Sequence, residues 1–168
     1  MTVEYGVVQV PQGWAAVAGT ELGLRALVLP KPRREDAEAA ILAEVPDARP
    51  HEGSLAGILR RLERYFSGES VAFSDEVDLG TATAFRQMVW RAAREIPWGE
   101  TRTYGWLAAH IGRPRSARAV GQALGSNPIP LVIPCHRVVG TAGDLRGFAD
   151  GLEMKSLLLS LESTGSKA

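Results

Sequence analysis

The clearest chemical signal in the chain is the segment Pro134-Cys135-His136-Arg137, which holds the only cysteine among 168 residues. A thiol is the strongest neutral-pH nucleophile among the side chains, and its reactivity follows its thiolate fraction. One cysteine cannot form an internal disulfide, and with three scattered histidines it makes a poor zinc site. A solitary cysteine is often only a small buried hydrophobe, but that reading leaves its proline, histidine and arginine neighbours unexplained. We therefore expect Cys135 to be the reactive atom of the protein.

The charges of the chain are divided unevenly, although they sum to zero. Residues 1–79 carry a net charge of −5 and residues 80–168 a net charge of +5. Residues 101–143 contain five arginines and no acidic residue. Such a window suits a polyanion such as a nucleic-acid backbone, but a solvated arginine-rich face gives the same pattern. Charge alone leaves both readings open.

The cellular compartment is inferred only from missing signals. No stretch is apolar and long enough to span a bilayer, and the N-terminus lacks a basic region followed by an apolar segment. An unpaired cysteine without an export signal fits a reducing compartment. We expect a cytoplasmic protein with no membrane partner.

The first half of the chain predicts a small antiparallel sheet followed by two helices. Residues 3–10, 14–18 and 24–29 are short β-prone runs separated by turn residues. Residues 34–45 have helical spacing of apolar side chains, and residues 47–53 read as a loop. Ser54 is expected to cap a second helix that ends at Phe66, before Ser67-Gly68. Nothing in this half carries a chemical motif, and His51 reads as a surface residue.

The second half predicts mainly helices. Thr83 can cap a helix whose apolar positions continue to Ile96, and Thr103 can cap a second helix. Gly112 is the expected stop of that helix and Pro114 the restart of a third one over residues 115–124. Two short helices joined by a tight Gly/Pro turn form a helix-turn-helix candidate. The predicted domains are residues 1–79, which are structural, and residues 80–168.

The outer face of the predicted third helix is nearly free of side-chain bulk. Val120 and Leu124, with Ala117, should point inward, whereas Arg118, Gly121, Gln122 and Gly125 fall on the other side. Helices that read a major groove carry several long polar side chains, so this face better suits the minor groove with one inserted arginine. Close packing against another helix would produce the same small residues and remains an alternative.

Three short motifs of the second half resemble, in order and spacing, those of the O6-alkylguanine-DNA alkyltransferases: Arg118-Ala119-Val120-Gly121, Asn127-Pro128 and Ile133-Pro134-Cys135-His136-Arg137-Val138. The likeness extends from Phe85 to Glu162 and is highly specific. The first half resembles the family only in its length, its predicted elements and the helix end at residues 66–68. The resemblance implies an α/β (α+β) fold: a ribonuclease H-like N-terminal sheet domain and a C-terminal domain with a winged-helix-like helix-turn-helix.

The resemblance also implies a suicide reaction on DNA. The helix-turn-helix would bind the minor groove of double-stranded DNA and flip out O6-alkylguanine, and O4-methylthymine as well. The alkyl group would then pass irreversibly to Cys135, once per protein molecule. Chemistry on a stacked base requires extrusion, and an arginine finger, here Arg118, would fill the vacated space. The resemblance implies a monomer that needs no cofactor.

The family pattern assigns roles to further residues of the site. Glu162 would orient His136, which acts as a base on Cys135 through a water, and an imidazolium held by Glu162 would favour a thiolate. Asn127 would order the active-site turn, although a plain Asn-Pro turn former reads the same way. Tyr104 would donate to the guanine ring as negative charge develops there, its alternative being a tyrosine packed on the core.

The resemblance places the remaining binding residues around the base and the DNA. The carbonyl of Val138 would accept from the guanine amino group, and the backbone N–H of Ala149 would donate to O6. The other expected substrate- and DNA-binding positions are Thr103, Arg115, Ala117, Arg118, Gly121, Gln122, Leu124, Pro130 and Phe148.

The chain departs from the family pattern after the catalytic segment. Phe148 stands where relatives often have tyrosine, so a ring remains but its hydroxyl is lost. Asp150 puts a carboxylate near the expected lip of the pocket, where it could weaken DNA contact or restrict bulky alkyl groups. The zinc site of some relatives needs cysteines that this chain lacks, so we predict no metal.

Three other functions compete with alkyl transfer. A non-catalytic binder of alkylated DNA would lack the reactive cysteine, so Cys135 argues against it. A cysteine hydrolase would need a histidine brought to the thiol from elsewhere, and His51 and His110 have no supporting motif. A transcription regulator would leave the segment around Cys135 without a purpose.

Overall fold

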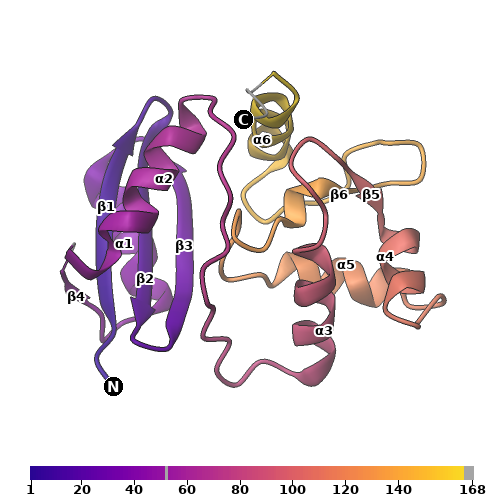
Figure 1. The fold of residues 1–168 in the computed structure, drawn as a ribbon, viewed down its shortest axis with the longest axis horizontal. Helices are drawn as coiled ribbons and strands as arrows, with labels where there is room; N and C mark the ends of the chain where they lie inside the picture. The colour runs from indigo at the N-terminus through magenta and orange to yellow at the C-terminus, as the bar shows by residue number, and fades with distance from the viewer. Residues whose placement is uncertain (52, 165–168) are drawn as a thin grey trace. The chain divides into compact units, whose positions relative to one another are not determined.

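The computed structural model describes residues 1–51 and 53–164, which form two compact units that divide after Gly80. Figure 1 shows a sheet with helices in the first unit and mainly helices in the second. The described residues contain no helix that is both long and apolar enough to cross a membrane. Each unit is built around its own elements.

The first unit is a four-stranded sheet with two helices. Strands β1 (Glu4–Val10), β2 (Gly13–Thr20) and β3 (Gly23–Lys31) form the expected antiparallel meander. A fourth strand, β4 (Arg49–Pro50), pairs parallel with β1, so the sheet order is β3-β2-β1-β4. The sequence prediction of a loop over residues 47–53 was therefore wrong at this point, because two residues without a β-pattern carry no strand signal.

The helices of the first unit cover apolar side chains of the sheet. Helix α1 (Arg34–Glu44) packs on β2 and β3 through Ala37 and Ile41. Helix α2 (Ala56–Phe66) lies against β1 and buries its apolar face, which is formed by Ile58, Leu59, Leu62, Tyr65 and Phe66. The expected cap at Ser54 is wrong: residues Gly53–Leu55 form a short 3-10 turn (η1), and the Ser54 hydroxyl contacts Glu4 instead. The helix consequently begins two residues after Ser54, without a side-chain cap.

An extended segment after α2 belongs to the first unit. The N–H of Leu24 donates to the carbonyl of Glu76 at 2.9 Å, and the N–H of Asp78 donates back to the carbonyl of Leu24 at 2.8 Å. Arg61 binds both carboxylate oxygens of Asp75, at 2.6 and 2.7 Å. These bonds hold residues 75–78 along β3.

The second unit consists of four helices and one short parallel strand pair. Thr83 and Thr103 cap α3 (Ala84–Ala93) and α4 (Tyr104–His110) as expected, each accepting from the backbone three residues on. Gly112, with φ of 76°, follows the end of α4. Helix α5 (Ala117–Gly125) begins later than expected, because Pro114 and Arg115 form a turn. Helix α6 (Leu152–Thr164) ends the described chain.

A two-stranded pairing brings distant parts of the second unit together. Strand β5 (Arg102–Thr103) pairs parallel with β6 (Val138–Val139), which directly follows the 3-10 turn η2 (Cys135–Arg137). Helix α4 starts immediately after β5, so its first residue, Tyr104, is placed near Cys135. The indole N–H of Trp90 donates to the carbonyl of Ala123 at 2.8 Å and so fixes α3 against α5.

Candidate active site

Asn127 fixes the turn between α5 and the cysteine. Its side-chain oxygen accepts from the N–H of Ile129 at 2.9 Å, which closes an Asx-type turn. Its amide nitrogen donates to the carbonyl of Ile133 at 2.8 Å and lies 3.2 Å from Cys135 Sγ. Asn127 therefore fits both interpretations made from the sequence, because its side chain forms the turn and also holds the thiol.

The loop between Asn127 and Cys135 is buried and locally strained. Leu131 has φ of 75° and is the one non-glycine residue with positive φ in the described parts of the chain. A branched side chain in this region costs about 1–3 kcal/mol, which the surrounding structure must offset. Pro130 and Ile133 form an isolated bridge across the loop, and residues 129–139 are all buried. The strained loop holds the cysteine in one position at the start of η2.

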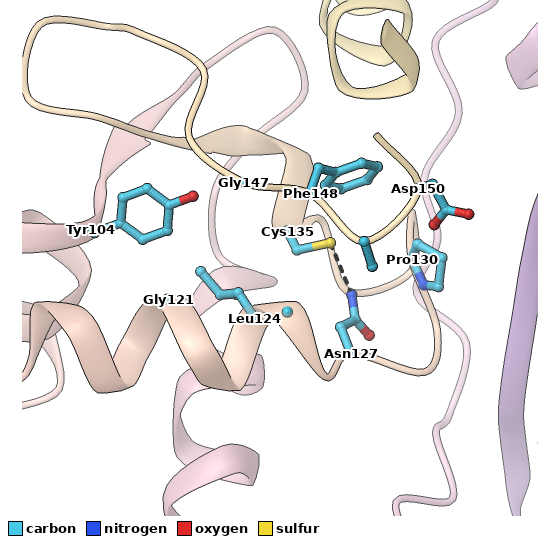
Figure 2. A pocket seen from close by; sticks show the side chains of 11 residues that line it. Tyr104, Gly121, Leu124, Asn127, Pro130, Cys135, Gly147, Phe148 and Asp150 are labelled. Carbon is cyan, nitrogen blue, oxygen red and sulfur yellow. Dashed lines mark hydrogen bonds between the residues drawn. The ribbon is translucent and has the colours of Figure 1, made fainter. Parts of the chain in front are cut away.

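The sulfur of Cys135 faces into a narrow pocket that is partly open to solvent. In Figure 2 Tyr104 lies on one side of the sulfur, and Pro130 and Asp150 lie on the other. The pocket is lined by the C-terminal part of α5, the loop after it and the segment before α6: Tyr104, Gly121, Leu124, Gly125, Asn127, Pro130, Cys135, Gly147, Phe148, Ala149 and Asp150. Tyr104 is therefore a pocket residue rather than a core residue.

A wider and more open groove adjoins this pocket. The two share six lining residues, among them Tyr104, Gly121 and Phe148. One wall of the groove is the outer face of α5, with Ala117, Arg118, Gly121, Gln122 and Gly125. The other wall is the segment after β6, including Arg146. The low bulk of α5 therefore leaves open space along this face, and at Gly121 it also lets the Tyr104 ring of α4 approach closely.

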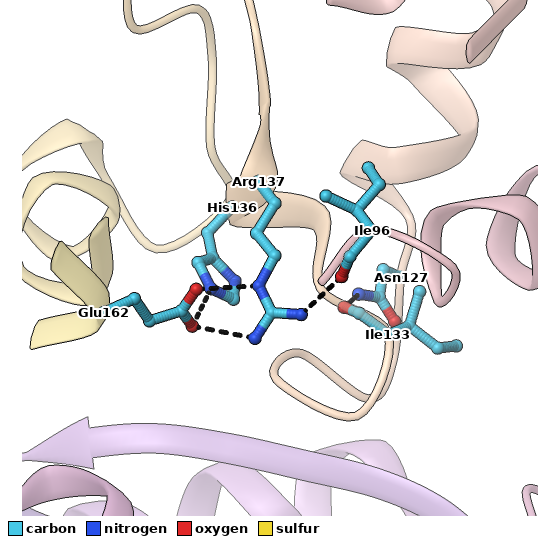
Figure 3. A network of polar contacts seen from close by, with 6 residues as sticks. All are labelled: Ile96, Asn127, Ile133, His136, Arg137 and Glu162. Atoms are coloured by element: carbon cyan, nitrogen blue, oxygen red, sulfur yellow. Dashed lines mark hydrogen bonds and ion pairs between the residues drawn. The ribbon is translucent and has the colours of Figure 1, made fainter. Parts of the chain in front are cut away.

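A buried network of charged groups lies directly after the cysteine (Figure 3). His136 Nε2 lies 2.6 Å from Glu162 Oε2. Arg137 donates to both oxygens of the same carboxylate, at 2.7 and 3.1 Å, and to the carbonyl of Ile96 at 2.7 Å. His136 and Glu162 are almost fully inaccessible to solvent. The structure thus brings together His136 and Glu162 as expected, and adds Arg137.

The protonation state of this network follows from burial and pairing. Burial would raise the pKa of Glu162, but the hydrogen bonds and charges of His136 and Arg137 lower it to about 2. Burial lowers the pKa of His136 against the pull of Glu162. At neutral pH an ionised Glu162 therefore accepts from a neutral imidazole, which carries its proton on Nε2. The other ring nitrogen, Nδ1, is left as a base, and it is buried without a hydrogen-bond partner among residues 1–51 and 53–164.

The thiol itself is not preformed as the thiolate that we expected. Burial raises the pKa of Cys135 to about 11, and the hydrogen bond from Asn127 and the charge of Lys155 offset this only in part. Asp150 raises the pKa further through its negative charge. The expectation failed because desolvation outweighs nearby positive charge at a thiol that is only 8 % exposed. The nucleophile must be deprotonated when the substrate is present.

Lys155 is a site residue that the sequence prediction missed. Its ammonium group is buried and donates to the carbonyls of Val138 at 2.7 Å and Arg146 at 2.9 Å. It also contacts the hydroxyl of Tyr104 at 3.4 Å. The available signal was its spacing: Lys155, Leu158 and Glu162 lie three and four residues apart, on one face of α6.

The remaining expected residues are distributed around the site. Leu124, Pro130, Phe148 and Ala149 line the pocket. Thr103 caps α4, and Arg115 is exposed in the turn before α5, so neither lines the pocket or the groove. Val138 also lines neither the pocket nor the groove, and its carbonyl accepts a hydrogen bond from Lys155. Within residues 1–51 and 53–164, no three His, Cys, Asp or Glu side chains are grouped to hold a metal ion.

Comparison with known proteins identifies both units. Residues 3–79 match the family model of the 6-O-methylguanine DNA methyltransferase ribonuclease-like domain. Residues 84–164 match the model of the 6-O-methylguanine DNA methyltransferase DNA-binding domain. The order of the two models along the chain agrees with the two compact units.

Individual relatives match over nearly their whole length. A methylated-DNA–protein-cysteine methyltransferase of Methanosarcina acetivorans is 42% identical over 95% of this chain and 98% of its own. One of Mycolicibacterium paratuberculosis is 42% identical over 99% and 96%. The O6-methylguanine methyltransferase of Mycobacterium tuberculosis superposes with a TM-score of 0.81 at 39% identity, covering 99% of this chain and 96% of that one. The Mycobacterium tuberculosis protein solved in complex with DNA gives 0.80 at 40%, covering 95% and 92%. The chain therefore belongs to the 6-O-methylguanine DNA methyltransferase family.

Proposed function

We propose that this protein repairs DNA by transferring the alkyl group of O6-alkylguanine irreversibly to Cys135. The observation that carries the proposal is the position of its only cysteine, whose sulfur faces a pocket next to an open groove along α5. A neutral histidine held by an ionised carboxylate follows directly in the chain. Family membership and a DNA-bound relative support the same reading.

Access to the pocket requires that the damaged nucleotide leave the duplex. A stacked base cannot present its O6 substituent to a sulfur inside the protein, so the base is flipped out at a cost of a few kcal/mol. The glycine-containing face of α5 approaches the minor groove closely, since Gly121 and Gly125 have no side chain. Arg118, exposed on the same wall of the groove, fills the space left in the stack.

The transfer step moves one alkyl carbon and one proton. His136 Nδ1 takes the thiol proton of Cys135 through a water, because no direct hydrogen bond joins the two side chains among the described residues. The sulfur attacks the alkyl carbon, the C–S bond forms, and the C–O6 bond breaks with its electron pair passing to guanine. Tyr104 donates a hydrogen bond to the guanine ring nitrogen that gathers negative charge, and the N–H of Ala149 stabilises O6. The proton held by His136 then passes through water to this nitrogen, which leaves neutral guanine and neutral His136.

Lys155 prepares Tyr104 for this donation. The ammonium group can only donate, so its contact with the tyrosine hydroxyl uses an oxygen lone pair and leaves the hydroxyl proton for the substrate. Its positive charge also favours the negative charge that develops on the departing guanine.

The product is a thioether, which water does not cleave under mild conditions, so each molecule reacts once. The same step removes the methyl group of O4-methylthymine, which offers an equivalent alkyl–oxygen bond next to a ring nitrogen. The protein works on double-stranded DNA as a monomer without a cofactor. The cytoplasmic location expected from the sequence stays a prediction.

Mass spectrometry distinguishes this function from non-catalytic binding of alkylated DNA. The protein is incubated with a duplex oligonucleotide that contains one O6-methylguanine, and its intact mass is measured. We expect a gain of one methylene, located on the peptide that carries Cys135, and no gain in Cys135→Ser. An unchanged mass in a protein that still retains the damaged duplex would instead identify a binding protein.

A further inference from the structure

The two ends of the pocket carry opposite charges. Lys155 Nζ lies 3.4 Å from the Tyr104 hydroxyl and 5.7 Å from the centre of its ring, so positive charge lies at the Tyr104 end. The carboxylate of Asp150 lies at the other end, beside Pro130 (Figure 2). The sulfur of Cys135 lies between the two ends.

A turn fixes Asp150 at this end. The N–H of Gly151 donates to the carbonyl of Phe148 at 3.0 Å, which closes a turn with Ala149 and Asp150 at its centre. Gly151 has φ of 92°, a conformation that favours glycine, and α6 begins at the next residue. The backbone on both sides of Asp150 is therefore held, and its side chain lines the pocket as part of the wall.

Both charges act on the sulfur. The negative charge of Asp150 raises the pKa of the Cys135 thiol, and the positive charge of Lys155 lowers it. A charged group on an alkyl substituent bound beside the sulfur would experience the same two fields.

The orientation of the substrate decides which charge the alkyl group meets. In the proposed function the guanine ring lies at the Tyr104 end, and its O6 substituent reaches the sulfur. Any part of the substituent beyond its first carbon then extends toward Pro130 and Asp150. We propose that Asp150 is a specificity-determining residue that selects neutral and cationic O6-alkyl groups and discriminates against anionic ones.

This inference rests on the proposed function and deepens it. The size of the effect follows from two like charges about 5 Å apart, which corresponds to about 4-fold in rate in water and on the order of 100-fold at an effective dielectric constant of about 20. Asp150 is exposed to solvent, which screens its charge, so we expect an effect between these two limits, about tenfold, which added salt reduces.

The test compares isosteric pairs of lesions in one duplex sequence. Single-turnover rates are measured for O6-carboxymethylguanine against its neutral amide, O6-carbamoylmethylguanine, and for O6-(2-aminoethyl)guanine against O6-(2-hydroxyethyl)guanine. In Asp150→Asn the acid-to-amide rate ratio should rise about tenfold. The amine-to-alcohol ratio should fall in the same variant. Asp150→Gly removes the same charge and should shift both ratios in the same direction.

Glu153→Gln is the matched control. Glu153 is exposed in the first turn of α6, three residues after Asp150, and lines neither the pocket nor the groove, so its loss should leave both ratios unchanged. Ratios that stay at their wild-type values in both Asp150 variants, while methyl transfer continues, would overturn the inference. A wild-type protein that takes no methyl group from O6-methylguanine would instead refute the proposed function.

Discussion

At the scale of single residues, the site depends on a thiol that burial keeps protonated. The pKa of Cys135 is raised from 9.0 to about 11, so at pH 7 only about one molecule in 10,000 carries a thiolate. A permanently ionised thiolate would react with many electrophiles. In the proposed function the thiol reacts only when a substrate is bound, with its proton passing through water to His136.

The pH dependence of alkylation by a small reagent measures this state. The rate at which iodoacetamide modifies Cys135 should rise about tenfold for each pH unit between pH 7 and 10, because the thiolate fraction rises in this way below the pKa. Its profile is followed by the mass of the modified peptide. The same protein unfolded in urea serves as the control and should level off near pH 9. A folded profile that levels off below pH 9 would show that the thiol is ionised at rest.

The buried carboxylate makes a second residue-scale prediction, on stability. The pKa of Glu162 falls from 4.5 to about 2 on folding, so its contribution is complete above pH 4.5 and is lost as the pH falls toward 2. The loss is on the order of 3 kcal/mol, because each pKa unit corresponds to about 1.4 kcal/mol. Urea unfolding between pH 5 and 2 should therefore show a smaller acid loss in Glu162→Gln than in the wild type.

The exposed Glu153 provides the control on the same helix, α6. Glu153→Gln should keep the acid loss of the wild type, since that carboxylate has solvent around it. Equal acid losses in the wild type and Glu162→Gln would contradict the assigned role of the buried carboxylate.

At the scale of elements, the sequence predicts helices well where local chemistry defines their ends. Thr83, Thr103 and Gly112 mark caps and stops that need no tertiary information, and the structure has them at these positions. Ser54 has the same chemistry as the two threonines, but its hydroxyl is engaged by Glu4, fifty residues away, and it caps nothing. Short strands such as β4, and the segment paired with β3, depend on partners that a local pattern does not reveal.

In the candidate site too, local sequence predicts some features, whereas others depend on partners that are distant in the chain. Cys135 and its neighbours are visible in a continuous motif, whereas the proximity of Tyr104 and Glu162 was known only through the resemblance. The β5–β6 pairing and α6 bring these two residues to the motif. The motif does not predict the protonated state of Cys135 or the contact of Arg137 with Glu162, because both depend on burial in the folded chain.

The outer face of α5 makes a prediction about base flipping. Arg118→Ala should slow transfer from duplex DNA by about 5- to 150-fold, since the vacated stack loses a partner worth about 1–3 kcal/mol. Reaction with the free base O6-methylguanine should hardly change, because a free base needs no flipping. The measurement is the pair of second-order rate constants. Equal losses on both substrates would refute the role of Arg118, and Arg86→Ala, which removes an exposed arginine of α3 outside the groove, is the control.

At the scale of the whole molecule, charge is divided between an acidic first half and a basic second half. Two arginines of the basic window, residues 101–143, already have acidic partners in the structure. Arg137 is buried against Glu162, and Arg102 contacts Glu100. The exposed Arg113 and Arg115 near the helix-turn-helix are the arginines that we expect to contact a phosphate backbone, whereas Arg118 is assigned to the base stack. A polyanion contact of this kind is strongly salt-dependent.

The salt dependence of duplex binding tests this assignment. In Arg115→Gln the slope of the logarithm of the binding constant against the logarithm of salt concentration should fall by about 1, because one phosphate contact is lost. The change should be the same for damaged and undamaged duplexes, measured by fluorescence anisotropy. Arg60→Gln, in the acidic half, is the control. A loss confined to the damaged duplex would place Arg115 at the lesion instead of the backbone.

The central claim is that Cys135 takes the alkyl group directly from the base. The most direct measurement uses a duplex whose O6-methylguanine carries a deuterated methyl group, with both products analysed from one reaction. The account predicts one labelled methyl on Cys135 per protein molecule and one restored guanine in the strand for each methyl transferred. Label released as methanol, or found on any other residue while guanine is restored, would contradict it.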